Sequence, residues 1–263
     1  MAYLDIESSS IYFEEYGKGK PLVLIAGLAS DSQSWLPVID KLSKYFRVII
    51  FDSRGLGRSS KDNSDISVRA MADDCIKLIR HLKLSSVYLL GHSMGGMIAM
   101  DMAIRYPGMV DKLILEATTP RMNKRNAELL NDWVSYLKTG MDKFLWFKNI
   151  FYWVFSSDFF ENKEMLTQVI NMSVNYPYPQ SDESFENQVK AISSFDCVSE
   201  LNMIQAQTLI IYGEKDILFS PSDNVKLFER IPGAQTITIS KVAHSIHMEN
   251  PDEFLECVID FCN

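Results

Sequence analysis

Five short runs of mainly apolar residues limit what this chain can fold into more than any other feature of its sequence. The runs cover residues 22–27, 47–52, 87–91, 112–117 and 208–213. Strands of a parallel sheet have this pattern, because helices cover the sheet on both faces. Segments of helical period separate the runs, and in residues 68–82 the side chains of Met71, Cys75 and Leu78 fall on one helix face. This alternation predicts an α/β fold with a mostly parallel sheet.

The alternation stops once, between residue 120 and about residue 205. This segment has helical stretches rich in Trp, Phe and Tyr, and an irregular stretch with two prolines at 175–179. A chain of 263 residues is near the upper limit for one hydrophobic core. We therefore expect a core domain of residues 1–119 and 206–263 and a helical cap of residues 120–205. The aromatic side chains of the cap pack it onto the core, line a pocket beneath it, or do both.

The composition argues against several partners and cofactors. With 47% hydrophobic and 23% charged residues the chain is typical of a globular protein, and its net charge of −8 argues against nucleic acid. No leader pattern and no run of about 18 uncharged apolar residues occur, so we expect a cytoplasmic protein without a membrane partner. The cysteines lack metal-ligand spacing and disulfide-scaffold density, and we expect no metal and no cofactor. The four are Cys75, Cys197, Cys257 and Cys262.

The third apolar run leads into a serine between glycines, in the sequence Gly91-His92-Ser93-Met94-Gly95. A tight turn from strand to helix holds a serine oxygen clear of the backbone, and side chains at the two glycines would clash with neighbouring chain. The helix that follows points backbone N–H groups at a reacting carbonyl. The pattern predicts Ser93 as a nucleophile and the N–H of Met94 as an oxyanion donor. A serine that only caps a helix is the simpler alternative.

A serine nucleophile needs a base, and the chain has four histidines. His81 ends an amphipathic helix and His92 lies inside the turn itself, so we assign structural roles to both. His244 and His247 lie in a loop after a strand-like segment at 236–239. Catalytic histidines occupy such loops at the carboxyl ends of strands. The residues alone leave His244 and His247 as candidates.

The orienting acid and a second oxyanion donor are expected in loops that follow apolar runs. Asp216 lies three residues beyond Gly213, and Glu116 near the end of the fourth run is the alternative acid. The N–H of Leu28, just after Gly27, is the candidate second donor. A further turn, after the second run, has residues typical of a hydrogen-bonded structural turn, namely Asp52, Arg54, Gly55, Gly57 and Ser59.

Four motifs together resemble the α/β-hydrolase superfamily over nearly the whole chain. They are D-x-R-G-x-G-x-S at 52–59, G-H-S-M-G at 91–95, G-E-K-D at 213–216 and A-H-x-x-x-x-E-x-P at 243–251. The resemblance implies an eight-stranded sheet flanked by helices, with a helical cap inserted after the sixth strand. It also implies a triad of Ser93, Asp216 and His244 in that chain order. The chain looks most like small bacterial esterases and lactonases, near 3-oxoadipate enol-lactonases and the carboxylesterase of biotin synthesis.

Two positions depart from the pattern of this superfamily. Ala26 stands where a histidine often precedes the glycine of the oxyanion loop, and Ala243 stands where glycine commonly precedes the catalytic histidine. A haloalkane dehalogenase would need aspartate in place of Ser93, because its nucleophile is a carboxylate. That chemistry is set aside.

These features predict a serine hydrolase that cleaves a small-molecule carboxylic ester or lactone through an acyl-enzyme. A carbon–carbon bond hydrolase or a cofactor-free perhydrolase would use the same triad, and a small-molecule receptor without turnover would keep the same fold. In the cap, we expect Trp146 and Trp153 to line an apolar substrate pocket. Arg121 is expected to meet a substrate carboxylate, although a solvated cation is the simpler interpretation.

Overall fold

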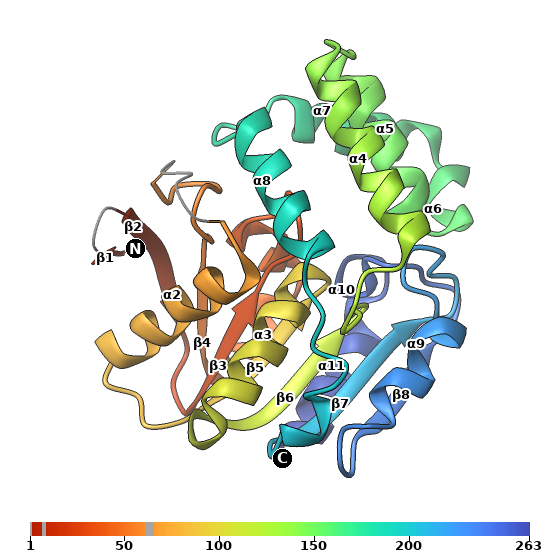
Figure 1. The fold of residues 1–263 in the computed structure, drawn as a ribbon. Coiled ribbons are helices and arrows are strands. Elements are labelled where there is room, and N and C mark those ends of the chain that lie inside the picture. The colour runs from red at the N-terminus through yellow and green to blue at the C-terminus, as the bar shows by residue number, and fades with distance from the viewer. Residues whose placement is uncertain (1, 7–8, 61–65) are drawn as a thin grey trace.

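An eight-stranded sheet forms the centre of the computed structural model, which describes residues 2–6, 9–60 and 66–263 (Figure 1). The strand order is β1-β2-β4-β3-β5-β6-β7-β8. Strand β2 pairs in antiparallel fashion with both β1 and β4. The remaining neighbours in this order, from β4 through β3 to β8, pair in parallel. The predicted α/β fold is confirmed. The strands are β1 Ala2–Ile6, β2 Ser9–Tyr16, β3 Lys20–Ile25, β4 Phe46–Phe51, β5 Val87–His92, β6 Val110–Glu116, β7 Gln207–Gly213 and β8 Gln235–Ile239.

Each of the five apolar runs forms one strand of the parallel part, from β3 to β7. The observed strand ends differ from the ends of the runs by no more than two residues. Side chains such as Leu24, Leu89 and Ile114 are fully buried in these central strands. The edge strand β1 keeps several exposed residues. Burial on both faces therefore explains why the central strands lack a polar alternation.

Helices cover both faces of the sheet (Figure 1). One face packs against α2 and α3 through residues such as Ile79 and Met97, and the other against α1 and α11 through Val38 and Phe254. These helices seal the sheet on both sides. Their bounds are α1 Leu36–Leu42, α2 Val68–His81, α3 Met94–Arg105 and α11 Pro251–Cys262, and the shorter helices beside them are α9 Pro221–Phe228, α10 Ile246–Glu249 and the 3-10 helices η1 Ser32–Trp35, η2 Pro107–Met109 and η3 Leu201–Met203. The last of these, η3, falls within the range 120–205 predicted as the cap, but it contacts α3.

The segment between β6 and β7 forms a group of helices at one end of the sheet (Figure 1). Many of its aromatic side chains pack on one another, as the stacked rings of Phe155 and Phe159 do at 4.1 Å. Buried residues of α4 and α8 join the same apolar cluster as the sheet. The helices fall inside the predicted cap, whose limits at 120 and 205 stay a prediction. They are α4 Lys124–Lys138, α5 Lys143–Val154, α6 Ser157–Glu161, α7 Lys163–Val174 and α8 Asp182–Ser193.

Within the described parts of the chain, no helix is both long and apolar enough to span a bilayer. The prediction about the N-terminal segment also involves residues 1, 7 and 8, which lie outside the described residues.

Candidate active site

Ser93 lies at the tight turn between β5 and α3, where the sequence places it. Its backbone has φ 53° and ψ −116°, a left-handed region that non-glycine residues rarely occupy. A Cβ at Gly91 would lie 2.3 Å from the carbonyl oxygen of Gly95, and a Cβ at Gly95 would lie 2.0 Å from that of Ile25. The two glycines therefore let strand, turn and helix pass close together while the serine points away from them.

His244 and Asp216 form a buried hydrogen-bonded pair. His244 Nδ1 lies 2.9 Å from Asp216 Oδ2, and the side chains are 3% and 1% exposed. The other oxygen of Asp216 accepts the N–H groups of Leu218 and Phe219 at 2.8 and 2.9 Å. Burial alone would raise the pKa of Asp216, but the facing imidazole and these N–H groups hold that pKa below its ordinary value. An ionised Asp216 accepts a hydrogen bond from Nδ1–H, which leaves Nε2 of His244 as an acceptor.

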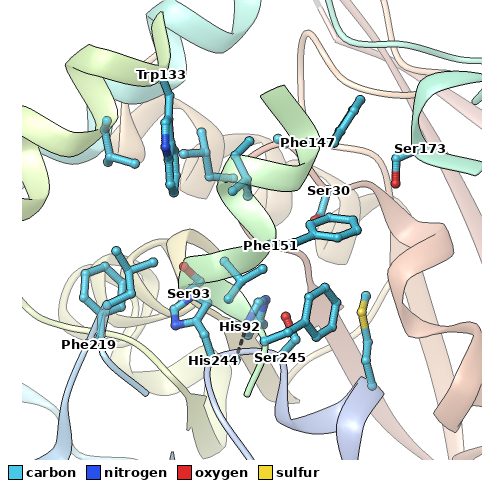
Figure 2. Close-up of a pocket in the computed structure, with 18 of the residues that line it drawn as sticks. Ser30, His92, Ser93, Trp133, Phe147, Phe151, Ser173, Phe219, His244 and Ser245 are labelled. Atoms are coloured by element: carbon cyan, nitrogen blue, oxygen red, sulfur yellow. Dashed lines mark hydrogen bonds between the residues drawn. The ribbon is translucent and has the colours of Figure 1, made fainter. Parts of the chain in front are cut away.

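Ser93 and His244 line one cavity of about 240 Å³ between the core and the cap. Figure 2 shows both residues on one side of this cavity, opposite the cap side chains Trp133, Phe147 and Phe151. Within the described part of the chain, no Lys, Arg, Asp or Glu lines it. Most of the remaining lining is aliphatic or aromatic, which suits an apolar portion of a ligand.

The two predicted oxyanion donors flank the serine. Leu28 lines the cavity, and Met94 is the first residue of α3. The loop before Leu28 passes so close that a Cβ at Gly27 would lie 3.3 Å from Cβ of Ser93. Neither amide donates a hydrogen bond to another group among the described residues. Their role as an oxyanion hole remains a prediction.

His92 also lines the cavity, although the sequence pointed only to a structural role for it. Its Nε2 donates a hydrogen bond of 3.0 Å to the carbonyl oxygen of His244, which Figure 2 shows as a dashed line. Burial lowers the pKa of His92 to about 3, so this imidazole is neutral. His92 thus ties the serine turn to the loop of His244, a contact that sequence patterns do not reveal because the two residues are 152 positions apart.

Glu116 and His247, the alternative acid and base, contact one another and not the first pair. His247 Nδ1 donates to Glu116 Oε1 over 2.8 Å, and both side chains are 0% exposed. Burial would raise the pKa of Glu116, but His247 and His92 hold it below its ordinary value. Potential ligand atoms of His92, Glu116 and His247 lie within 4.8 Å of one another, and among the described residues this is the one such cluster found.

None of the three cap residues predicted for the substrate pocket lines the cavity beside Ser93, but Trp146 lines a groove that adjoins this cavity. Trp146 is buried against Phe185, and its indole N–H donates to the carbonyl of Trp133 over 2.9 Å. Trp153 is half-buried, and the guanidinium of Arg125 lies 5.8 Å from its ring. Arg121 is exposed and pairs with Asp196 at 3.6 Å. Trp133, Phe147 and Phe151 line the cavity instead, because they project from the inner sides of α4 and α5.

The turn at 52–59 supports the loop that carries Leu28. The carboxylate of Asp52 accepts the N–H groups of Ser32 and Arg58 at 3.0 and 2.8 Å. Ser59 donates its hydroxyl to the carbonyl of Asp52. Gly57 has φ +53°, and a Cβ there would lie 2.3 Å from Asp52 Oδ2. These contacts are those of a structural turn, in line with its sequence.

These residues form a candidate hydrolase site, and comparison with known proteins gives the family of the chain. The model of the alpha/beta hydrolase fold family matches residues 20–251, so the chain belongs to this family. Curated relatives include putative carbamate hydrolases RutD, of Agrobacterium fabrum (26% identity, 95% of this chain, 97% of the relative) and Serratia proteamaculans (27%, 93% and 92%).

Solved structures agree with this assignment. The enol-lactonase from Burkholderia xenovorans superposes with a TM-score of 0.90 at 23% identity over 99% of both chains, which shows the shared fold. An esterase from Exiguobacterium antarcticum has a TM-score of 0.86 at 26% identity over 96% of this chain and 95% of its own. The resemblance to esterases and lactonases seen in the sequence is confirmed at this level.

Proposed function

We propose that the protein is a serine hydrolase that cleaves a carboxylic ester or lactone with an apolar acyl portion. One observation carries the proposal: Ser93 and His244 line the same apolar cavity, and His244 is hydrogen-bonded through Nδ1 to a buried carboxylate. A serine and a histidine beside one cavity, with a carboxylate behind the histidine, support the roles of nucleophile, base and orienting acid in acyl transfer.

The reaction follows from the tautomer of His244. Asp216 binds Nδ1–H, so Nε2 takes the hydroxyl proton of Ser93 while its oxygen attacks the ester carbonyl. The N–H groups of Leu28 and Met94 stabilise the oxyanion of the tetrahedral intermediate. Nε2–H then protonates the leaving alcohol as the C–O bond breaks, which leaves an ester on Ser93. Water, deprotonated by His244, attacks this ester, and the acid product leaves as the serine regains its proton.

The cavity favours a neutral, apolar acyl group. Its wall has aromatic residues from the cap and no charged Lys, Arg, Asp or Glu in the described chain. A groove of about 690 Å³ adjoins it and shares Ala29, Ser30 and Phe147 with it. Polar groups such as Asp31 and Gln33 line that groove, which suits a polar leaving group. Since Arg121 pairs with Asp196 outside the cavity, a carboxylate on the acyl portion has no cation to meet there.

Carbamate hydrolysis is the second candidate, because relatives over nearly the whole chain have the name putative carbamate hydrolase. A carbamate carbonyl would meet the same nucleophile and oxyanion donors. Carbon–carbon bond hydrolysis, perhydrolysis and binding without turnover also fit this fold. A substrate panel separates these activities.

The deciding experiment combines active-site labelling with a substrate series. Intact-protein mass spectrometry after exposure to a fluorophosphonate should show a single adduct, located at Ser93 by peptide mapping. Hydrolysis of p-nitrophenyl esters from acetate to decanoate should peak at one chain length, set by the cavity, and should exceed hydrolysis of p-nitrophenyl carbamates. A folded protein with neither adduct nor turnover would contradict the proposal and favour a receptor.

A further inference from the structure

A second imidazole–carboxylate pair, His247 and Glu116, lies next to the candidate active site, with the ring of His92 between the two histidines. The ring of His92 is 5.0 Å from the rings of both His244 and His247, measured between centroids. The indole of Trp35 covers His247 at a centroid distance of 4.4 Å. Neither His247 nor Glu116 lines the cavity beside Ser93 or the groove that adjoins it. The side chains of this pair therefore do not border a ligand bound in that cavity, and we look for their role in the segments that they connect.

Glu116 contacts both segments that the proposed reaction brings together. Its backbone carbonyl accepts the N–H of Ser93 over 2.9 Å. Its carboxylate accepts both the backbone N–H and Nδ1 of His247, three residues after His244, over 2.9 and 2.8 Å. His92, adjacent to Ser93, adds its hydrogen bond to the carbonyl of His244. The serine turn and the histidine loop are thus joined through the end of β6.

Stability alone does not account for such a pair. Glu116 Oε2 and His247 Nε2 are buried without a hydrogen-bond partner among the described residues. Each such atom carries a desolvation penalty of about 1–3 kcal/mol. Apolar side chains of similar volume are often at least as stable in place of a buried ionic pair. A requirement for a defined loop geometry explains why polar groups occupy this site.

We propose that Glu116 and His247 are positioning residues for the serine hydrolase proposed above. Their hydrogen bonds hold the loop of His244 in register with the turn of Ser93, so that Nε2 stays within reach of the serine hydroxyl. A displacement of about 1 Å between reacting groups lowers a rate by up to about 100-fold. Because the cavity wall does not include the pair, its loss acts on kcat and leaves KM unchanged.

The test compares two substitutions at one position. His247→Leu removes the side-chain donor, whereas His247→Asn keeps an N–H donor near the place of Nδ1. We expect His247→Leu to lower kcat for p-nitrophenyl esters, and the fluorophosphonate labelling rate, by about 10- to 100-fold with KM within about twofold. His247→Asn should keep most of the wild-type kcat. Asp101→Asn, which weakens an ion pair with Arg105 on α3, is the control for a lost charged contact away from the site.

Glu116→Gln keeps the side-chain volume and covers the case in which His247→Leu does not fold. It should lower kcat about tenfold at unchanged KM, because a charged acceptor becomes a neutral one. The proton NMR resonance of His244 Nδ1–H should shift in the same variant.

Three results would overturn the inference. They are wild-type kcat in folded His247→Leu or Glu116→Gln, equal losses in the Leu and Asn variants, and one equivalent of bound metal in the purified protein, which would make the cluster with His92 a metal site. A wild-type protein without turnover and without an adduct would instead refute the proposed function, and this inference with it.

Discussion

The molecule contains two imidazole–carboxylate pairs that are nearly alike in their own geometry. His244 and Asp216 are 2.9 Å apart, His247 and Glu116 are 2.8 Å apart, and all four side chains are buried. The two pairs differ in the surroundings of the imidazole ring. His244 faces the cavity that also exposes Ser93, whereas His247 is covered by Trp35. The comparison teaches that the proposed catalytic pair and the proposed positioning pair differ in their access to Ser93 and the cavity, and not in the pairing itself.

The largest expected effect belongs to Ser93, the proposed nucleophile, which lines the cavity together with His244 and not with His247. Ser93→Ala should lower kcat by about 10⁴-fold or more, because no serine oxygen is then present to attack the ester carbonyl. Steady-state hydrolysis of p-nitrophenyl esters measures the loss, and circular dichroism checks the fold. A variant that kept wild-type turnover would contradict a catalytic role for His244 and Asp216.

The two carboxylates should differ by orders of magnitude in their catalytic effect. Asp216→Asn should lower kcat by about 10⁴-fold, since an amide favours the wrong tautomer of His244. Glu116→Gln should lower it by only about tenfold, since the carboxylate positions a loop. Steady-state kcat of both variants on one p-nitrophenyl ester measures the two effects side by side. The reverse order would make Glu116 the orienting acid and exchange the roles of the two pairs.

In stability, by contrast, the two pairs should behave alike at acid pH. The pKa values of Asp216 and Glu116 are both lowered in the folded protein despite burial. A carboxyl of this kind stabilises the fold above its unfolded pKa of about 4, and the contribution is lost as pH falls through the folded value. Urea unfolding at pH 6 and at pH 3 should therefore show a smaller pH dependence in Asp216→Asn and Glu116→Gln than in wild type. Wild-type pH dependence in one variant would show that its carboxylate is not ionised in the fold.

The sequence predicted the site near Ser93 far better than the second pair. The glycines around Ser93 and the apolar runs before each loop are local signals, because close backbone approach and burial on both faces restrict residue type directly. The chain also offered Glu116 and His247 as an alternative acid and base. It did not show that they contact one another, since that contact spans 131 positions and depends on how β6 and the last loop meet.

The cap was predicted only as a group of helices. Trp133 and Trp146 are both buried aromatics on adjacent helices, yet Trp133 lines the cavity beside Ser93 and Trp146 lines the adjoining groove. Helical period distinguishes buried from exposed faces, but it does not distinguish a face packed on another helix from one that borders a cavity. The pocket therefore depends on the crossing of α4, α5 and α8, which tertiary packing alone decides.

The smallest expected effects come from the aromatic neighbour of each imidazole. Phe219 lies 5.3 Å from His244 and lines the cavity, whereas Trp35 lies 4.4 Å from His247 and is fully buried. Phe219→Leu should raise KM for the preferred ester by about tenfold, because ligand contact is lost. Trp35→Phe should leave KM unchanged and lower the free energy of unfolding by about 1–3 kcal/mol, because only packing is lost.

Steady-state kinetics and urea unfolding of the two variants test whether the two neighbourhoods have separate roles. A KM change in Trp35→Phe would mean that the surroundings of His247 affect substrate binding as well as the position of the His244 loop. An unchanged KM in Phe219→Leu would mean that the substrate avoids the wall beside His244, and the acyl portion would then have to lie against the cap aromatics. In either case, the position of the two imidazoles would not be enough to tell which pair affects substrate binding, and the residues of the cavity wall would have to be tested one by one.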